Sequence, residues 1–514
     1  MSSYHPAKEI ELKLRIAPEA VRRLAAHPLL KGAGRPVTER LRSIYYDTPA
    51  HDLLRQGIAL RVRKVGGAWV QTVKGGGAAR AGLHERAESE ARVAGPEPEL
   101  DRIEDKTLAR ALNPPRIRDE LGPVFVTEFR RNRRLLTLPG GSSVEASIDQ
   151  GVIRSGKHAN RLVELELELK QGDSSELYEL ALKLQRDVPL ALENRSKAER
   201  GYALRRAEQI LPVKSQAPVL DSGMSVGDAF QAVMWTGLAH LDANESGMLA
   251  GGDPEFLHQM RVALRRLRSA LGVFSPPVSD SATEPLAREL KWLASNLGPA
   301  RDWDVFITET LPPIEGEFGA HGELRAFCMR CQNLRRRANT RARQAVRSMR
   351  YRRLMLTLAG WLAVETREAT TSDPQRDELA KPVSGFAAGV LERRYQQARR
   401  RGRRLTQRSP AELHRLRIAI KKFRYATDFF ASLYESKAAR DMLKQLRYLQ
   451  DILGAMNDAA TVAGLIRHGF AGSRGKGVLE ARGILLGWSR GRVVTLKREL
   501  MRAWKAFRAA EKFW

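Results

Sequence analysis

Two glutamates and a lysine at alternate positions, Glu9, Glu11 and Lys13, form a set of side chains suited to phosphate chemistry. In an extended strand alternate residues share one face, so the three charged groups lie together while Ile10 and Leu12 face the other way. Neighbouring carboxylates can hold a divalent cation, and the ammonium beside them can hold a phosphate group. Phosphoryl transfer requires this combination. A strand with a solvated charged face shows the same alternation, so the other segments decide between the two interpretations.

The charges on several later segments are separated by sign. Arg61 and Arg63 share one face of an expected strand, and Lys74 ends the next one. Acidic residues are concentrated on the opening strand and on the segment 162–170, where three glutamates alternate with leucines. A site for a metal ion and a chain of phosphates needs such segregation, because carboxylates gather around the metal while cations hold phosphate oxygens. The apolar faces would then pack outward against helices and close the sheet around a polar channel.

The hydrophobic pattern changes once along the 514 residues. Residues 1–205 alternate at every second position in many segments separated by Gly and Pro, which predicts a mainly antiparallel sheet domain with a few helices. Residues 206–221 show neither period and are interpreted as a linker. From residue 222 to residue 514 the period is helical, which predicts an all-α domain. The chain is long enough for each domain to bury its own core.

The helical region contains an internal repeat with a spacing of 156 residues. The segment 257–268 matches 413–424, and 297–302 matches 453–458 in the same register. Two separated matches at one spacing indicate a duplicated unit. We expect the repeat halves to span about residues 225–370 and 385–514.

Each copy of the longer motif places a histidine and three cations along one side of a helix. At about 100° per residue these side chains fall within one arc, beside an apolar stripe that packs inward. The residues are His258, Arg261, Arg265 and Arg268 in the first copy and His414, Arg417, Lys421 and Arg424 in the second. A basic surface built twice suits an extended polyanion. Lys291 and Arg447, at the same spacing, extend the surface, whereas Asp302 and Asp458 are interpreted as structural.

The chain is strongly basic, with 88 Lys and Arg against 59 Asp and Glu and a net charge of +29. Residues 1–210 hold 37 of the basic and 29 of the acidic residues, so most of the excess lies downstream. Such a charge predicts a polyanionic partner: nucleic acid, an anionic membrane or a phosphate polymer. Only 6% of residues are aromatic and no base-stacking motif is present, so we expect no specific nucleic-acid partner.

No apolar run reaches the length of a membrane span, and the N-terminal residues lack the apolar core of a signal peptide. We therefore expect a cytoplasmic protein with no membrane partner. Cys328 and Cys331 form a lone C-x-x-C without a second Cys or His pair nearby, and we interpret them as reduced thiols without a function.

The first 205 residues resemble the CYTH domain, a family also called the triphosphate tunnel metalloenzymes. The resemblance lies in the ordered set Glu9-x-Glu11-x-Lys13, Tyr45-Tyr46-Asp47-Thr48-Pro49, Leu60-Arg61-Val62-Arg63, Lys74, Ile148-Asp149-Gln150-Gly151, Glu164-Leu165-Glu166-Leu167-Glu168 and Ser196-Lys197. It implies an α+β domain in which an eight-stranded antiparallel tunnel with flanking helices binds a triphosphate chain. It also implies one or two Mg²⁺ or Mn²⁺ ions as cofactors.

The resemblance assigns roles to individual positions. It implies that the metal-binding carboxylates are Glu9, Glu11, Asp149, Glu166 and Glu168, with Glu164 as an alternative member of the last pair. It implies that the triphosphate-binding bases are Lys13, Arg61, Arg63, Lys74, Arg86, Arg131 and Lys197. The expected catalytic group is Glu9, Glu11, Lys13, Arg61, Arg63, Lys74 and Lys197.

Residues from about 222 to 514 resemble the CHAD domain, a helical domain with conserved histidines. The resemblance implies two pseudo-symmetric helical bundles that bind inorganic polyphosphate, and it implies association with polyphosphate granules. His258 and His414 match the family histidines, and the cations of the two stripes match its phosphate contacts.

The order of the two domains resembles that of bacterial inorganic triphosphatases. It implies an enzyme that hydrolyses inorganic triphosphate to pyrophosphate and phosphate with Mg²⁺, joined to a polyphosphate-binding module. One alternative is a non-catalytic polyphosphate-binding or granule-associated protein. Another is a tunnel enzyme for thiamine triphosphate, or for ATP as in the class IV adenylyl cyclases. A non-catalytic anion binder has no use for four or five carboxylates facing its ligand, which favours the enzyme.

Overall fold

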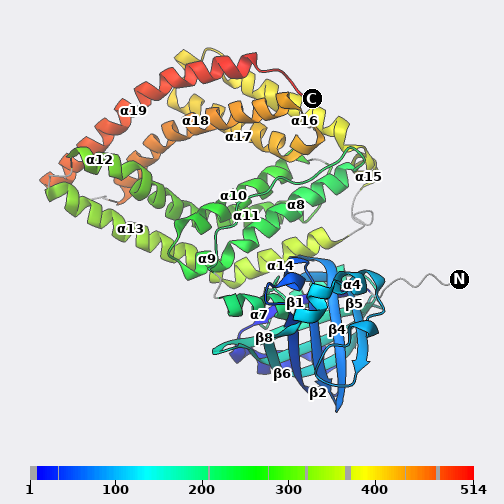
Figure 1. Cartoon of the computed structure of the whole chain (residues 1–514). Helices are drawn as coiled ribbons and strands as arrows, with labels where there is room; N and C mark the ends of the chain where they lie inside the picture. Colours follow the sequence, from blue (N-terminus) through cyan, green and yellow to red (C-terminus); the bar gives the residue numbers. More distant parts are fainter. Residues whose placement is uncertain are drawn as a thin grey trace. The chain divides into compact units, whose positions relative to one another are not determined.

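The computed structural model describes residues 8–32, 34–206, 209–275, 277–318, 322–364, 372–434, 436–469 and 475–514 (Figure 1). Contacts divide the chain into two compact units. The first unit is Met1–Ile210 together with Arg352–Glu365, and the second is Leu211–Tyr351 together with Thr366–Trp514. The segment 352–364, which we expected in the first helical repeat, is therefore grouped with the sheet.

The first unit is built on antiparallel strands whose apolar and charged faces alternate as predicted. The strands are β1 (Lys8–Ile16), β2 (Val37–Asp47), β3 (Ala59–Val65), β4 (Ala68–Arg80), β5 (Leu83–Val93), β6 (Gly122–Thr137), β7 (Ser143–Ser155), β8 (His158–Gln171) and β9 (Leu190–Leu192). Their order is β5-β4-β3-β2-β6-β7-β8-β1-β9, and β1 also pairs with β5. Eight strands therefore close on themselves, and β9 adds to the end of β1. The predicted eight-stranded antiparallel tunnel is confirmed.

The outward faces of the strands form the hydrophobic core with short helices. These are η1 (Pro18–Ala20), α1 (Val21–Ala25), α2 (Pro28–Lys31), α3 (Asp52–Arg55), η2 (Leu100–Arg102), α4 (Lys106–Leu112), α5 (Pro115–Glu120), α6 (Ser175–Leu184) and α7 (Lys197–Arg206). Leu60 and Val62 of β3 are fully buried in a cluster with Leu108, Leu112 and Ile117. Because the apolar faces point outward, the charged faces line the interior of the closed sheet.

Helix α7 packs across β6, β7 and β8. Its Tyr202 meets the ring of Phe125 edge-on at 5.2 Å, and Phe125 stacks on Tyr45 at 4.5 Å between ring centroids. A methyl group at Gly201 would lie 2.2 Å from the Phe125 ring, so only glycine allows this close approach. The Tyr202 hydroxyl also donates to Asp47 at 2.8 Å. These contacts fix the helix whose first residue is Lys197.

The named elements of the second unit are all helices among its described residues, as predicted. Its helices, together with α14, are α8 (Val226–Ala243), α9 (Glu245–Ala250), α10 (Pro254–Val273), α11 (Thr283–Val305), η3 (Phe306–Thr310), α12 (Leu311–Phe318), α13 (Gly322–Arg347), α14 (Met349–Ala363), α15 (Asp373–Ala380), α16 (Val383–Arg401), η5 (Leu405–Gln407), α17 (Pro410–Phe430), η6 (Ala431–Leu433), α18 (Lys437–Gly469) and α19 (Lys476–Ala509). Among the described helices, none combines the length and apolar character that a membrane span needs.

The sequence repeat corresponds to a structural one. The longer motif lies on α10 and on α17, and each of these helices begins with a proline after a capping residue, Asp253 or Ser409. The shorter motif lies on α11 and on α18. Helix α10 packs against both α11 and α17, and α17 packs against α18, so the two basic helices meet where the repeats join (Figure 1).

Candidate functional site

The inward faces of the closed sheet enclose a cavity of about 300 Å³. Every tunnel residue predicted from the sequence lines this cavity except Asp149 and the alternative metal ligand Glu164. The lining therefore includes Glu9, Glu11, Lys13, Arg61, Arg63, Lys74, Arg86, Arg131, Glu166, Glu168 and Lys197. It also includes Glu90 and Glu145, which the resemblance did not assign to the site. Their alternation with apolar neighbours was the available signal for them.

One side of the cavity is rich in carboxylates. Glu11 of β1 lies opposite Glu168 of β8, and Glu145 of β7 lies opposite Glu168 from the other side. Burial raises the pKa of Glu9, and the charge of Glu11 raises it further. Burial also raises the pKa of Glu168, with repulsion from Glu9 and Glu145 adding to the effect. A cation placed among these four groups would relieve their repulsion.

The other side of the cavity is rich in arginine. Arg63 donates from Nε to the hydroxyl of Ser43 at 3.0 Å, and Arg61 lies 4.0 Å from Glu88. Burial lowers the pKa of Arg63 to about 9, and the positive charges of Arg61 and Arg131 contribute. A guanidinium whose pKa falls this far has too little negative charge around it. A bound anion would supply that charge.

Two lysines of the cavity, Lys13 and Lys74, pair with its carboxylates. The Lys13 ammonium lies 2.7 Å from Glu11 and also forms an ion pair with Glu166. Burial acts to raise the pKa of Glu11, but the nearby Lys13 outweighs it and holds this pKa at about 2. Lys74 forms ion pairs with Glu9 and, at 3.2 Å, with Glu88. In the described structure both lysines therefore neutralise carboxylates.

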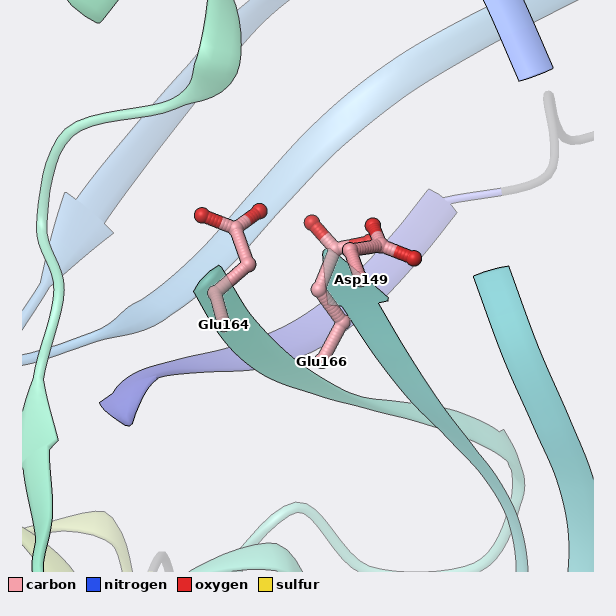
Figure 2. A group of neighbouring side chains, drawn as sticks. All are labelled: Asp149, Glu164 and Glu166. Atoms are coloured by element: carbon pink, nitrogen blue, oxygen red, sulfur yellow. The ribbon is translucent and has the colours of Figure 1, made fainter. Parts of the chain in front are cut away.

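Three carboxylates beside the cavity, those of Asp149, Glu164 and Glu166, come close enough to bind one metal ion. Their ligand oxygens lie within 4.8 Å of one another, and Figure 2 shows the side chains projecting from β7 and β8. The ammonium of Lys197, however, contacts all three, at 2.8 Å from Asp149, 2.5 Å from Glu164 and 2.8 Å from Glu166. Lys197 thus stands where a cation would bind. We call this group the lysine-centred cluster.

The ion pairs of the lysine-centred cluster hold Asp149 outside the lining of the cavity. The Asp149 carboxylate is fully buried and accepts two hydrogen bonds from Arg131, at 2.8 and 2.7 Å. Glu164 is also fully buried and pairs with Arg200 at 2.8 Å. Asp149 thus pairs with Lys197 and Arg131, and Glu164 pairs with Lys197 and Arg200. The strand faces on which these acids lie could be predicted from the sequence, but the cations that pair with them could not.

The helical unit contains a groove of about 670 Å³ lined by α10, α11, α17, α18 and α19. The basic residues in its lining are His258, Arg261, Arg265, Arg301, Arg417, Lys421, Arg424, Arg447 and Arg492. Arg268 and His414, both predicted for this surface, are exposed and lie outside the lining, as does Lys291. Arg301 and Arg492 were not predicted. Asp302 and Asp458, interpreted as structural, line the groove.

The groove lacks the negative charge needed to neutralise its cations. Burial lowers the pKa of Lys421 to about 7, and the charges of Arg417 and Arg265 contribute. The buried Nε atoms of Arg265 and Arg417 have no hydrogen-bond partner among the described residues. Burial, followed by the charge of Arg301, lowers the pKa of His258 to about 4, so this imidazole is neutral at physiological pH. These are the properties expected of an anion site.

The two cysteines differ from these groups. Both are buried on α13, and burial raises the pKa of the Cys328 thiol to about 12 and raises that of Cys331 as well. Thiolate formation is therefore unfavourable at both positions.

Residues 7–202 match the family model of the CYTH domain, and residues 232–467 match that of the CHAD domain. The chain is a CYTH domain followed by a CHAD domain. The CYTH match covers all the strands of the closed sheet, and the CHAD match covers both basic helices of the groove.

The chain is similar to individual proteins over part or most of its length. An inorganic triphosphatase of Haemophilus influenzae is 33% identical over 207 residues, which are 38% of this chain and 55% of that protein. An uncharacterised protein of Mycobacterium tuberculosis is 25% identical over 454 residues, covering 82% of this chain and 80% of that one. The crystal structure of the CHAD domain from the plant Ricinus communis is similar at 34% identity and a TM-score of 0.51, covering 59% of this chain and 99% of that one.

The lysine-centred cluster predicts a local effect on stability. Replacing Lys197 by Met should lower the free energy of opening of the β7–β8 region by about 3–5 kcal/mol, because three buried carboxylates lose their shared cation. Hydrogen exchange of the β7 and β8 amides measures this quantity.

The matched control is Lys170→Met. This side chain also pairs with a tunnel glutamate, Glu168, but it is 42% exposed, so the loss should stay below about 1 kcal/mol. Equal effects of the two substitutions would contradict the role assigned to Lys197.

Proposed function

We propose that the CYTH tunnel hydrolyses inorganic triphosphate to pyrophosphate and phosphate with the help of Mg²⁺. The observation that supports this most is the division of one small cavity into a carboxylate side and an arginine side that still lacks negative charge. A divalent cation would bind to the carboxylate side, and a short phosphate chain would supply negative charge to the arginine side. The similarity to the inorganic triphosphatase of Haemophilus influenzae supports this proposal.

The residues present fit a hard divalent cation. Glu9, Glu11, Glu145 and Glu168 line the cavity and offer oxygen ligands, which Mg²⁺ and Mn²⁺ both prefer. The raised pKa values of Glu9 and Glu168 reflect an excess of carboxylate there. Among the described residues each of these four carboxylates forms an ion pair with one cation, whereas Asp149 and Glu166 are each held by both Lys197 and Arg131. We therefore propose the four as the metal ligands, in preference to Asp149 and Glu166. The bound ion would neutralise part of the charge that develops on the phosphate oxygens.

The chain's own residues hold the substrate in place. Arg61 and Arg63 present guanidinium groups to the cavity and can each bind phosphate oxygens. Arg131 donates from Nε and Nη2 to Asp149, so Nη1 is the nitrogen that it can offer to a phosphate. The arginines fix the direction of the chain and neutralise its charge, and this positioning is most of what phosphoryl transfer requires. The enclosing strands limit how the terminal phosphate can lie relative to the attacking water.

The cavity favours an inorganic chain over a nucleotide. Its volume is about 300 Å³, and charged and hydroxyl groups dominate its lining. Binding sites for organic ligands are larger on average and mostly apolar. We therefore propose inorganic triphosphate as the substrate, with thiamine triphosphate and ATP as the competing substrates that an assay must test.

We also propose that the CHAD groove binds inorganic polyphosphate. Arg265 of the first repeat and Arg417 and Lys421 of the second line the same groove, so one extended chain can contact both repeats. Binding would restore the charge of Lys421, whose pKa is held near 7 in the free protein. The affinity should fall steeply with salt concentration.

The tunnel proposal predicts metal-dependent turnover. Triphosphate should release phosphate only with Mg²⁺ or Mn²⁺, and Glu9→Gln should lower kcat/KM at least about 100-fold, since it removes one charged ligand while keeping the side-chain shape. Phosphate release from triphosphate, pyrophosphate, ATP, thiamine triphosphate and long-chain polyphosphate is the measurement.

Glu120→Gln, the same change at an exposed position on α5, should leave turnover unaltered. If no substrate is hydrolysed with either metal while polyphosphate still binds, the protein is a phosphate-chain binder without catalytic activity.

The groove proposal predicts proton uptake on binding. At pH 8 the free Lys421 ammonium, with its pKa of about 7, is largely deprotonated. The groups that face it are Arg417 and Arg424 on its own helix, Arg265 on α10 and Asp458 on α18. Polyphosphate raises this pKa, so binding at pH 8 should take up close to one proton at Lys421, and this contribution should vanish at pH 5.5, where Lys421 is already protonated.

Calorimetry in buffers of different ionisation enthalpy measures this uptake. Lys421→Met should abolish it, whereas Lys422→Met, at the exposed neighbouring position, should not. Uptake that persists in Lys421→Met would show that another group titrates on binding.

A further inference from the structure

The helical unit holds a second cavity beside the polyphosphate groove. It has a volume of about 440 Å³ and lies between α17, α18 and α19. Leu413, Met456, Leu486 and Val493 contribute apolar walls. Arg417, Ser489 and Ala459 line both this cavity and the groove, so the two spaces adjoin. We call it the side pocket.

The side pocket has a structural cause in the second repeat. Ala459 and Ala463 line it, and the residues 156 positions earlier in the first repeat are Trp303 and Ile307. Trp303 is 7% exposed and meets Phe306 edge-on at 5.7 Å, so its indole fills space in the first repeat. Two alanines leave the corresponding space open in the second. Apolar cavities of this size reduce stability unless something fills them.

The charges around the side pocket select an anion. Arg408, Arg417, Arg490 and Lys497 line it, and no carboxylate does among the described residues. A ligand must therefore combine an apolar body with a negatively charged group. Since Arg417 belongs to both spaces, the charged group of that ligand comes to lie at the groove.

The polar groups in the wall favour a heterocycle over an acyl chain. Nδ1 of His414 lies 3.0 Å from Oδ1 of Asn457, and both residues line the pocket together with the buried Ser489. Imidazole, amide and hydroxyl groups can hydrogen-bond to the ring nitrogens and exocyclic groups of a heterocycle, and an acyl chain offers no such groups. A volume of about 440 Å³ is within the range of small-molecule sites.

We propose that the side pocket binds the base of a nucleoside polyphosphate whose phosphate chain lies in the groove. The inference rests on the proposed function of the groove as a phosphate-chain site. The second repeat would then recognise the nucleoside at the end of the phosphate chain. The first repeat would contact phosphate alone, because Trp303 fills the corresponding space. His414, which lines the side pocket and not the groove, would then contact the base.

The test compares ATP with tripolyphosphate, which carries the phosphates without the nucleoside. Binding to the full-length protein is measured by calorimetry in EDTA, so that nothing is hydrolysed. Ala463→Ile, which introduces the residue of the first repeat, should weaken ATP binding about ten-fold and leave tripolyphosphate within about two-fold. Ala506→Ile, at an exposed position of α19, should change neither. An ATP affinity unchanged by Ala463→Ile, or equal losses for both ligands, would overturn the proposal.

A second measurement needs no variant. Photolabelling with 8-azido-ATP should modify peptides of α18 or α19 that line the side pocket, and excess ATP should protect them better than excess tripolyphosphate. Labelling confined to the sheet unit would overturn the proposal. Failure of the groove itself is recognised separately, by a tripolyphosphate affinity that Lys421→Met does not change.

Discussion

A charged side chain can be buried inside a closed sheet only where an opposite charge meets it. The interior of the CYTH sheet holds carboxylates on β1, β5, β7 and β8 and cations on β1, β3, β4, β5 and β6, far from full solvation. The free energy of removing such groups from water is several kcal/mol for each ion, about as large as the stability of many whole domains. Lys197, in contact with three carboxylates, is where this constraint is met most completely. Helix α7 and its packing against Phe125 are what hold this lysine there.

We assign phosphate-chain binding to the places where the charges of the protein are incompletely neutralised. Arg63 in the tunnel and Lys421 in the groove are both buried among like charges, and their pKa values fall to about 9 and about 7. Glu9 and Glu168 show the opposite imbalance, with raised pKa values among other acids. The two domains have unrelated folds, yet each keeps positive charge that a phosphate chain would neutralise. A common ligand chemistry accounts for their presence in one protein.

Much of the tunnel could be predicted because strand alternation is a local property. The residues of one strand that share a face are known once the strand is known, and this placed Glu9, Glu11 and Lys13 together correctly. The choice between Glu164, Glu166 and Glu168 could not be made in the same way. It depends on Lys197 and Arg200, which approach from a helix more than 25 residues later in the sequence. Contacts of this kind are set by tertiary packing.

The helical unit shows the same limit. The repeat spacing identified α10 and α17 as equivalent, but the arc of each helix that faces the groove depends on its neighbours. Arg268 and His414 therefore fell inside the predicted stripe and outside the observed groove, while Arg301 and Arg492 joined it from other helices. The replacement of Trp303 by Ala459 was visible in the aligned repeats. Its consequence, an open pocket, required the three-dimensional structure.

The central claim is that the tunnel binds a divalent cation at its carboxylate side and a phosphate chain at its arginine side. A crystal structure with Mn²⁺ and a non-hydrolysable triphosphate analogue tests it most directly, because anomalous scattering locates the metal. The account predicts Mn²⁺ between the carboxylates of Glu9, Glu11 and Glu168, with the phosphates against Arg61 and Arg63. Mn²⁺ bound by Asp149, Glu164 and Glu166, with Lys197 displaced, would contradict it.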